Sequence, residues 1–527
     1  MTRTSSAAWP LDTLLAPAAA RRGLRGLERE ALRVTPEGNI AQTPHPAALG
    51  SALTHPQITT DFSEALPEFV TSPHETTAET LSELAAITAS AARHIGDELL
   101  WMTSMPCFLD DPDSIPVARY GTSNSGRMKH LYRVGLVHRY GRAMQSIAGV
   151  HFNYSFPEAL WEPLLATRGE KSTRAARDVA WMGLIRNVQR HGWLLSYLFG
   201  ASPAVCPSFT REPPRWLGPL AGGTLAARFA TSLRLSDIGY KNRSQAALHV
   251  STNSLDEYLA DLSRALATDE PAYAAIGLRD GEDWRQLSTA VLQIENEYYG
   301  LVRPKRQPRR GERPSISLAR EGVHYVEVRA LDIDPTTALG ITAETMDFLE
   351  LFLWFALLAP SPPLSGGEHL EIDSNLRNVA IRGREPGLCL CHGNECVPLA
   401  AWAGEIVAAM EPIAEYLDRG LAEAPYAAAL ARARECIADP DATPSAHALA
   451  DIEAEAGGFL GWALENARRH NATLRTLPLD PPTSQRFERA ARDSISRQAE
   501  LEATDNEPFE TYLARYYDGI QRNVVPL

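Results

Sequence analysis

The sequence predicts an α+β fold, because half-buried strands from distant parts of the chain are mixed with helical runs. Segments 149–156 and 324–334 alternate apolar and polar residues, as strands with one buried face do. Helical periodicity separates these strands and dominates from residue 401 onward. At roughly 100–200 residues per domain, a chain of 527 residues has room for two to four compact units.

The individual elements follow from local patterns along the chain. Residues 1–22 predict an irregular start or a short helix, because Pro10, Asp12 and Pro17 interrupt the apolar stretch that a signal peptide needs. Strand-like segments are found at 26–34 and 59–69. Helices are expected at 76–100, 171–200 and 342–360. Turn-forming residues predict loops at 121–129 and 301–316.

Charge and cysteine content argue against several functional classes. The chain has 65 acidic and 51 basic residues, a formal net charge of −14, whereas nucleic-acid binders carry a basic stripe. Anionic small substrates remain compatible, since local arginines can outweigh the overall sign. Six cysteines are too few for a disulfide framework and fit a reducing, cytoplasmic compartment. The strongest apolar run, 348–360, is too short to span a bilayer, so we interpret it as a buried helix and expect no membrane association.

Common catalytic motifs narrow the function further by their absence. The sequence contains neither the G-x-S-x-G nucleophile elbow nor H-E-x-x-H. The segment 121–129 approaches a phosphate-binding loop, but Arg127 replaces its lysine and Met128 its hydroxyl residue. Cys389, Cys391, His392 and Cys396 form C-x-C-H-x₃-C, which departs from common zinc spacings, so we interpret them as a chance cluster.

Two glutamates in GLEREALRV (26–34) raise the question of what compensates their charge. The strand period puts Glu28 and Glu30 on one face with Leu32 and Val34. Two carboxylates this close repel, and one should hold a proton unless a cation lies between them. A hard divalent cation such as Mg²⁺ takes oxygen ligands and is usually shared with substrate phosphates.

Other strand-like segments carry the same kind of residue. These residues are Asp61, Glu68, His151 and Glu327. The alternative is a two-sided sheet on which each carboxylate faces water. The residue pattern by itself leaves both interpretations open and indicates no more than a metal-dependent site.

A series of long motifs resembles glutamate–cysteine ligases of the proteobacterial type, in family order between about residues 20 and 360. They are GLERE (26–30), SALTHPQITTDFSEALPEF (51–69), YGTSNSGRMKHLYRVGL (120–136), YLFGASPAVC (197–206), TSLRLSDIGY (231–240), QIENEYYGLVRPKR (293–306) and HYVEVRALDIDP (324–335). The resemblance implies a single unit, 1–527, with the catalytic sheet in 20–360 and a mainly helical C-terminal lobe in 361–527. It also implies a curved, mostly antiparallel sheet forming a funnel, as in glutamine synthetase, surrounded by helices.

The same resemblance implies an activity. The γ-carboxylate of L-glutamate is joined to the amine of L-cysteine through γ-glutamyl phosphate, with ATP converted to ADP and phosphate, in the first step of glutathione biosynthesis. The implied partners are small molecules: glutamate, cysteine and ATP, with Mg²⁺ or alternatively Mn²⁺. We expect a cytoplasmic monomer that binds neither nucleic acid nor membrane.

Site residues follow from the resemblance position by position. The implied metal ligands are Glu28, Glu30, Asp61, Glu68, His151 and Glu327. The implied catalytic arginines are Arg329 and Arg234. The implied substrate-binding residues are Tyr132, Arg133, Leu136, Gln145, Asn153, Tyr240, Tyr299 and Phe62. Without the resemblance, the arginines would be interpreted as ion-pair residues and the tyrosines as core or rim residues.

Pro67 departs from the family pattern, because an aliphatic residue is expected before Glu68. Proline cannot donate a hydrogen bond to a neighbouring strand, so Glu68 should begin its strand or lie at an edge or bulge.

Two other functions stay open at this point. One is a related ATP-dependent ligase that joins glutamate to a different amine, since acceptor choice depends on few pocket contacts. The other is a catalytically inactive binding protein that keeps the fold, against which the retained carboxylates argue.

Overall fold

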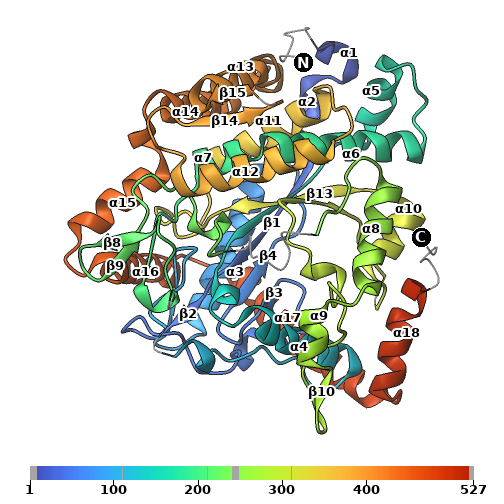
Figure 1. Ribbon diagram of the computed structural model, residues 1–527, viewed down its shortest axis with the longest axis vertical. Helices are drawn as coiled ribbons and strands as arrows, with labels where there is room; N and C mark the ends of the chain where they lie inside the picture. The colour runs from blue at the N-terminus through green and yellow to red at the C-terminus, as the bar shows by residue number, and fades with distance from the viewer. Residues whose placement is uncertain are drawn as a thin grey trace.

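The computed structural model describes residues 9–109, 111–210, 212–239, 248–309, 311–393 and 395–521. Within these ranges the largest sheet has six strands, all paired antiparallel, in the order β12–β13–β6–β1–β4–β3 (Figure 1). In that order the strands are Val302–Lys305, Tyr325–Leu331, Val150–Ser155, Leu24–Glu30, Pro67–Val70 and Ile58–Thr60. An antiparallel sheet among helices confirms the predicted α+β class.

The register of the central strands brings polar residues side by side. Glu30 of β1 lies opposite Glu68 of β4, and Glu28 lies opposite His151 of β6. Across the next pair, Glu327 of β13 lies opposite Asn153 of β6. Because side chains alternate along a strand, all of these project from the same face of the sheet. Although these residues are spread over 300 positions of the sequence, from Glu28 to Glu327, they form one polar row on the sheet.

The opposite face of the sheet is mostly apolar, although it also carries buried arginines of β1, and helix α11 (Ala343–Leu358) packs against it. Every residue of α11 from Met346 to Leu357 is buried, which confirms the predicted buried helix and explains its nearly continuous apolar sequence. Its one buried glutamate, Glu350, accepts a hydrogen bond from Tyr154 of β6 and forms an ion pair with Arg25 of β1. This contact fixes α11 to the centre of the sheet.

Helices surround the sheet on all sides (Figure 1). Those before α11 are α1 Leu11–Leu14, α2 Pro17–Ala20, α3 Thr77–Arg93, α4 Asn124–Tyr140, α5 Trp161–Thr167, α6 Arg174–His191, α7 Trp193–Phe199, α8 Leu255–Ala267, α9 Pro271–Ile276 and α10 Pro314–Glu321. Those after it are α12 Gly366–Arg382, α13 Leu399–Asp418, α14 Pro425–Ala438, α15 Pro444–Ala454, α16 Gly458–Thr476, α17 Pro481–Thr504 and α18 Phe509–Gln521. None of the described helices is both long and apolar enough to cross a bilayer.

Short strands form small sheets outside the main one. The pairs are β2 Arg33–Val34 with β5 Leu99–Leu100, β10 Arg279–Asp280 with β11 Asp283–Trp284, and β14 Cys389–His392 with β15 Glu395–Pro398. A three-stranded group contains β7 Ala204–Val205, β9 Thr224–Ala226 and β8 Gly218–Leu220.

The helices of the last third pack back onto the N-terminal elements. Helix α16 contacts α3, α17 contacts α3, and α18 contacts α4 and α8. In Figure 1 this orange-to-red segment runs around the molecule from α13 to α18. The predicted helical character of this segment is therefore confirmed, and its helices share the core of the preceding elements.

Six element predictions need correction. The strand-like segment 59–69 is two strands, β3 and β4, which pair with each other, and the helix expected at 76–100 ends at Arg93, after which residues 99–100 form β5. The segment 26–34 is two strands, because the chain leaves the main sheet after Glu30 and β2 pairs with β5. Residues 171–200 form two helices that meet at Gly192. The predicted loop 121–129 becomes helix at Asn124, whose preceding Ser123 caps the helix by accepting from the backbone N–H of Gly126. The predicted loop 301–316 contains the edge strand β12 and the start of α10.

Candidate active site

The site is built around three side chains from the central strands of the sheet. One ligand atom each from Glu28, His151 and Glu327 can be chosen so that all lie within 4.8 Å of one another. His151 Nδ1 lies 3.3 Å from Glu28 Oε2 and 3.4 Å from Glu327 Oε1. Asn153 donates to Glu28 Oε1 over 2.9 Å, which holds that carboxylate toward the histidine. Two carboxylates and an imidazole thus converge on one point.

A second group of carboxylates lies next to the first. Glu30 and Glu68 face each other across β1 and β4, and Asp61 follows directly after β3. Glu30 Oε2 accepts a 2.7 Å hydrogen bond from the backbone N–H of Gly149, and its Oε1 lies 3.8 Å from His151 Nε2. His151 therefore lies between the two groups, and together they form a continuous acidic cluster.

The acidic cluster has opposite electrostatic effects on its members. Burial, followed by the charges of Glu28, Asp61 and Glu30, raises the pKa of Glu68 well above its ordinary value. Burial also raises the pKa of Glu30, with Asp61 adding to the effect.

At the other end of the acidic cluster, cations lower the pKa of Glu327. Although burial opposes ionisation, Lys305, Arg329 and His151 hold the pKa of Glu327 well below its usual range. Lys305 Nζ lies 3.3 Å from Glu327 Oε2, and Arg329 donates to Oε1 over 3.0 Å. Glu327 is thus ionised next to two positive charges, while Glu68 and Glu30 hold their protons more tightly than ordinary carboxyl groups do.

Arg234 is held beside this cluster by a close backbone approach. It lies in the 3₁₀ turn Leu233–Leu235, is 1% exposed, and donates to the carbonyl of Arg329 over 2.9 Å. A Cβ atom at Gly149 would lie 2.3 Å from the Arg234 guanidinium. Glycine is therefore required at position 149, because both the Arg234 guanidinium and the Glu30 carboxylate lie close to its backbone.

A more apolar wall adjoins the acidic cluster and comes largely from α4. Tyr132, Arg133 and Leu136 lie on this helix, with Tyr132 and Leu136 buried. The Arg133 side chain donates to the carbonyl of Asp61, so α4 is tied to the strand end that carries Asp61. Phe62, the next residue, is 1% exposed. These contacts place the aromatic wall at the Asp61 end of the acidic cluster.

Gln145 and Tyr299 extend this wall. The Gln145 side-chain amide donates to the Tyr299 hydroxyl over 3.2 Å. Burial raises the pKa of both Tyr132 and Tyr299, so both phenols are neutral hydrogen-bonding groups. Tyr299, Arg234 and Arg329 also line a cavity of about 400 Å³, and residues from the middle of α12 contribute to its lining. The arrangement can hold a small molecule against the cluster.

The structure brings together all of the predicted site residues that it describes. Tyr240 lies outside the described residues. Pro67 is the first residue of β4, as expected from its missing donor, and its carbonyl accepts from the N–H of Ala31. Because β4 lies between β1 and β3, Glu68 is in the sheet interior and not at an edge.

Sequence reasoning missed two residues of the site, Lys305 and Gly149. Lys305 was hidden because its segment was interpreted as a loop, although Arg303 and Lys305 alternate with Val302 and Pro304. The signal for Gly149 is its place directly before the strand of His151. A glycine there indicates close packing against the backbone.

Comparisons with known proteins show which family the chain resembles. The family model described as Glutamate-cysteine ligase matches residues 14–379. A protein named glutamate–cysteine ligase from Azotobacter vinelandii is 48% identical over 507 residues, which cover 95% of each chain. Another from Pseudomonas paraeruginosa is 46% identical over 498 residues, which cover 94% of each chain.

A solved structure extends the comparison to three dimensions. The crystal structure of glutamate–cysteine ligase from Francisella tularensis in complex with AMP matches with a TM-score of 0.89 and 34% identity. The match covers 95% of the present chain and 99% of that chain. Sequence and structure therefore agree over nearly the full length, and the chain belongs to the glutamate–cysteine ligase family.

Proposed function

We propose that the protein joins the γ-carboxylate of L-glutamate to the amine of L-cysteine, with ATP converted to ADP and phosphate. The single observation that carries this proposal is the convergence of Glu28, His151 and Glu327 beside Arg329 and Lys305. Phosphoryl transfer needs positioned cations far more than covalent catalysis by the protein. The names of the relatives supply the two amino-acid substrates, and the AMP complex of the Francisella protein fits a nucleotide substrate.

The donor set fits Mg²⁺ or Mn²⁺. Five carboxylates and one imidazole face the same region, and oxygen ligands are what Mg²⁺ prefers, while imidazole is better suited to Mn²⁺. The raised pKa values of Glu30 and Glu68 mean that burial and neighbouring carboxylates together outweigh the nearby cations, so a bound cation would stabilise their ionised forms. The residues that would hold metal are Glu28, Glu30, Asp61, Glu68, His151 and Glu327. A bound divalent ion would neutralise the charge on the phosphate oxygens.

The chain's own cations act on the transferring phosphoryl group. Arg329 and Lys305 approach Glu327 from two sides, so permanent positive charge lies at the edge of the cluster. Arg234, fixed by the carbonyl of Arg329, adds a planar guanidinium suited to a carboxylate or a phosphate. Transfer converts the γ-carboxylate of glutamate, which is a poor acyl donor, into γ-glutamyl phosphate.

The cysteine amine then attacks the acyl carbon, and phosphate leaves. Tyr132, Arg133, Leu136, Gln145, Tyr299 and Phe62 are proposed to bind this acceptor, together with Tyr240. Aromatic walls limit the size of the side chain, while phenol and amide groups can bind its polar ends. The hydrogen bond between the Gln145 and Tyr299 side chains fixes the orientation of both groups before the acceptor binds. Asn153, which holds Glu28, is the remaining proposed substrate-side residue.

Product identification tests this proposal. The protein is incubated with glutamate, cysteine, ATP and Mg²⁺, and each component is omitted in turn while products are identified by mass spectrometry. We expect γ-glutamylcysteine, ADP and phosphate only in the complete mixture. Replacing cysteine by 2-aminobutyrate or alanine should slow ADP release. Equal rates with all three acceptors would instead favour a ligase with another amine substrate, and ADP release without glutamate would overturn the assignment.

A further inference from the structure

The hairpin β14–β15 presents three thiols on one outward face. Cys389 and Cys391 lie two residues apart on β14, and Cys396 lies directly opposite Cys391 on β15. Cys391 and Cys396 are exposed, and Cys389 is half-buried. The other face of the hairpin packs inward through Leu390, which is 1% exposed. The sequence suggested that these cysteines cluster by chance, but the structure places their thiols in a row on one face of the hairpin.

The pairing of Cys391 with Cys396 is of the type that brings side chains close. The backbone N–H of Cys391 donates to Asn375 Oδ1 over 2.8 Å, and its C=O accepts from Asn375 Nδ2 over 2.7 Å. Its peptide groups therefore point away from β15, so the pair is a non-hydrogen-bonded one. Such pairs have Cα atoms about 4.5 Å apart, within the roughly 4.4–6.8 Å that a disulfide spans.

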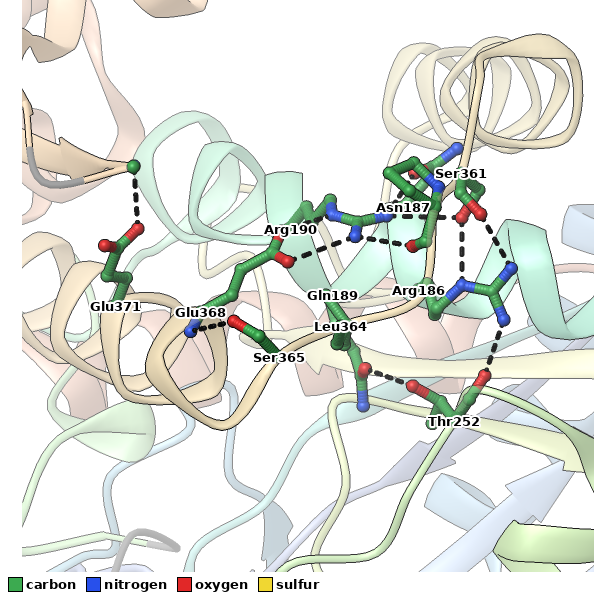
Figure 2. Close-up of polar contacts among 12 residues, drawn as sticks. Arg186, Asn187, Gln189, Arg190, Thr252, Ser361, Leu364, Ser365, Glu368 and Glu371 are labelled. Atoms are coloured by element: carbon green, nitrogen blue, oxygen red, sulfur yellow. Dashed lines mark hydrogen bonds and ion pairs between the residues drawn. The ribbon is translucent and has the colours of Figure 1, made fainter. Parts of the chain in front are cut away.

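Helix α12 fixes the hairpin in this position. Asn375 of α12 is 2% exposed and bonds the strand as described, and Glu371, one turn earlier, accepts from the backbone N–H of Gly393 over 2.9 Å. Figure 2 shows Glu371 reaching the hairpin, while Glu368 of the same helix pairs with Arg190 of α6 over 2.6 Å. The two thiols are therefore held opposite each other by a buried anchor and do not depend on the exposed strands alone.

We propose that Cys391 and Cys396 form a dithiol site that is reversibly oxidised to a disulfide by low-molecular-weight disulfides. The exposed Cys391 thiolate attacks one sulfur of the reagent and releases its first half as a thiol. Cys396 loses its proton, attacks the Cys391 sulfur and releases the second half. Two protein thiols are thereby oxidised, and one disulfide reagent is reduced to two thiols. Excess small thiol reverses both steps, as expected for an exposed disulfide.

Cys389 is the third thiol of the row, and it affects the order of the two steps. A side-chain hydrogen bond with Cys389 raises the pKa of the Cys396 thiol. Because the thiolate is the attacking species, this contact favours Cys391 as the first nucleophile and Cys396 as the group that closes the disulfide. Cys389 itself pairs in register with Pro398 and has no thiol directly opposite.

Peptide mapping of the full-length protein tests the site. The reduced protein is incubated with oxidised glutathione, remaining thiols are alkylated, and the protein is digested with trypsin. Residues 385–419 contain no internal lysine or arginine, so Cys389, Cys391 and Cys396 fall in one peptide. We expect this peptide to carry one internal disulfide between Cys391 and Cys396 and one alkyl group on Cys389. A disulfide from Cys389 to Cys396, a persistent glutathione adduct, or three alkylated thiols would overturn the proposal.

Matched variants isolate the pair. Cys389→Ser should still form the disulfide, whereas Cys391→Ser and Cys396→Ser should stop at the glutathione adduct. All three should keep ligase activity within about twofold, because surface substitutions rarely change stability much and none of the three thiols lies at the acidic cluster. The unsubstituted chain decides the question even where a variant fails to fold. Its disulfide pattern is also independent of which acceptor the enzyme uses.

Discussion

At the scale of single residues, the site combines charges that do not balance. Burial, followed by neighbouring carboxylates, raises the pKa values of Glu68 and Glu30, while Lys305 and Arg329 keep Glu327 ionised. A divalent cation would contribute most near Glu68 and Glu30, and a phosphoryl group would meet fixed positive charge near Glu327. Each residue thus has a distinct role that a substitution can test.

Glu327→Gln keeps the shape of the side chain but removes its negative charge. Because Lys305 and Arg329 would lose their shared partner and the metal site one carboxylate, we expect kcat to fall about 10²–10³-fold. Glu321→Gln, an exposed substitution at the end of α10, is the matched control and should leave kcat unchanged. Steady-state kinetics at saturating Mg²⁺ measures both. Equal activity of the two variants would show that the Glu327 carboxylate is not needed for catalysis.

Gly149→Ala tests the close approach of Arg234. The added Cβ would lie 2.3 Å from the guanidinium, so Arg234 must move away from its place beside Arg329. A displacement of about 1 Å can cost on the order of 10²-fold in rate, and we expect a loss of that size in kcat/KM. Gly218→Ala is the control, because a Cβ there meets nothing within 4 Å. Unchanged kinetics of Gly149→Ala would show that Arg234 need not occupy this position.

At the scale of elements, the segment before β3 depends on a neutral histidine. His55 Nδ1 accepts hydrogen bonds from the backbone N–H groups of Gln57 and Ile58, over 3.1 and 2.9 Å. Burial, with a contribution from Arg497, lowers the pKa of His55 to about 4. Protonation would remove both bonds at the entrance to the strand that leads to Asp61.

This lowered pKa predicts a pH dependence of folding. The folded value lies below the unfolded value of 6.5, so the stabilisation is complete above pH 6.5 and is lost as the pH falls toward 4. The full loss amounts to about 3 kcal/mol at 1.36 kcal/mol per pKa unit. In His55→Gln, the unfolding free energy from urea titrations should fall less steeply between pH 6.5 and 4.5. The control His447→Gln, an exposed position on α15, should follow the unsubstituted protein. A slope of His55→Gln as steep as that of the control would contradict the assignment.

The elements also show what local sequence patterns can and cannot predict. The strands of His151 and Glu327 were found from alternation alone, because apolar and polar residues alternate along each of these six- and seven-residue strands. The four-residue strand β12 was interpreted as a loop, since Pro304 and its basic neighbours are typical of loops. Its pairing with β13 is a tertiary contact that no short pattern reveals. The break after Glu30 has the same origin, because Ala31 and Arg33 bond to the carbonyls of Pro67 and Ala65.

The site residues also divide into those that local sequence patterns indicated and those that such patterns did not reveal. Alternation alone indicated a metal-dependent site, and the motif resemblance was needed to suggest specific ligands and the aromatic acceptor wall. Tyr132 and Arg133 lie on a helix whose apolar and polar residues form no clear stripe, so periodicity gives them no role. Lys305 was missed together with its strand. The structure brings the described residues together, and their individual roles stay predictions that the variants above test.

At the scale of the whole molecule, the C-terminal segment supports the site from a distance. The side chain of Asp505, just after α17, accepts from the Asn124 side chain over 2.7 Å and from its backbone N–H, at the start of α4. The carbonyl of Glu507 accepts a second bond from the Asn124 side chain, also over 2.7 Å. Helix α4 carries Tyr132 and Arg133, so residues nearly 400 positions later in the sequence help to position the proposed acceptor wall.

Asp505→Ala should therefore affect substrate binding as well as stability. The buried Asn124 side chain would lose a charged partner, and we expect a loss of about 1–3 kcal/mol in unfolding free energy. The KM for cysteine should rise several-fold while the KM for ATP changes little. Asp493→Ala, an exposed substitution on α17, serves as the control. A rise in both KM values by the same factor would point to general destabilisation instead of a shift of α4.

The central claim is that carboxylates from separate strands form one divalent-metal site for the nucleotide. The most direct test is the anomalous diffraction of Mn²⁺ in crystals grown with a non-hydrolysable ATP analogue. We predict anomalous peaks within about 2.5 Å of carboxylate oxygens of Glu28 and Glu327, adjoining the phosphates of the analogue. A bound analogue with no Mn²⁺ at this cluster, or with Mn²⁺ held by other residues, would contradict the account.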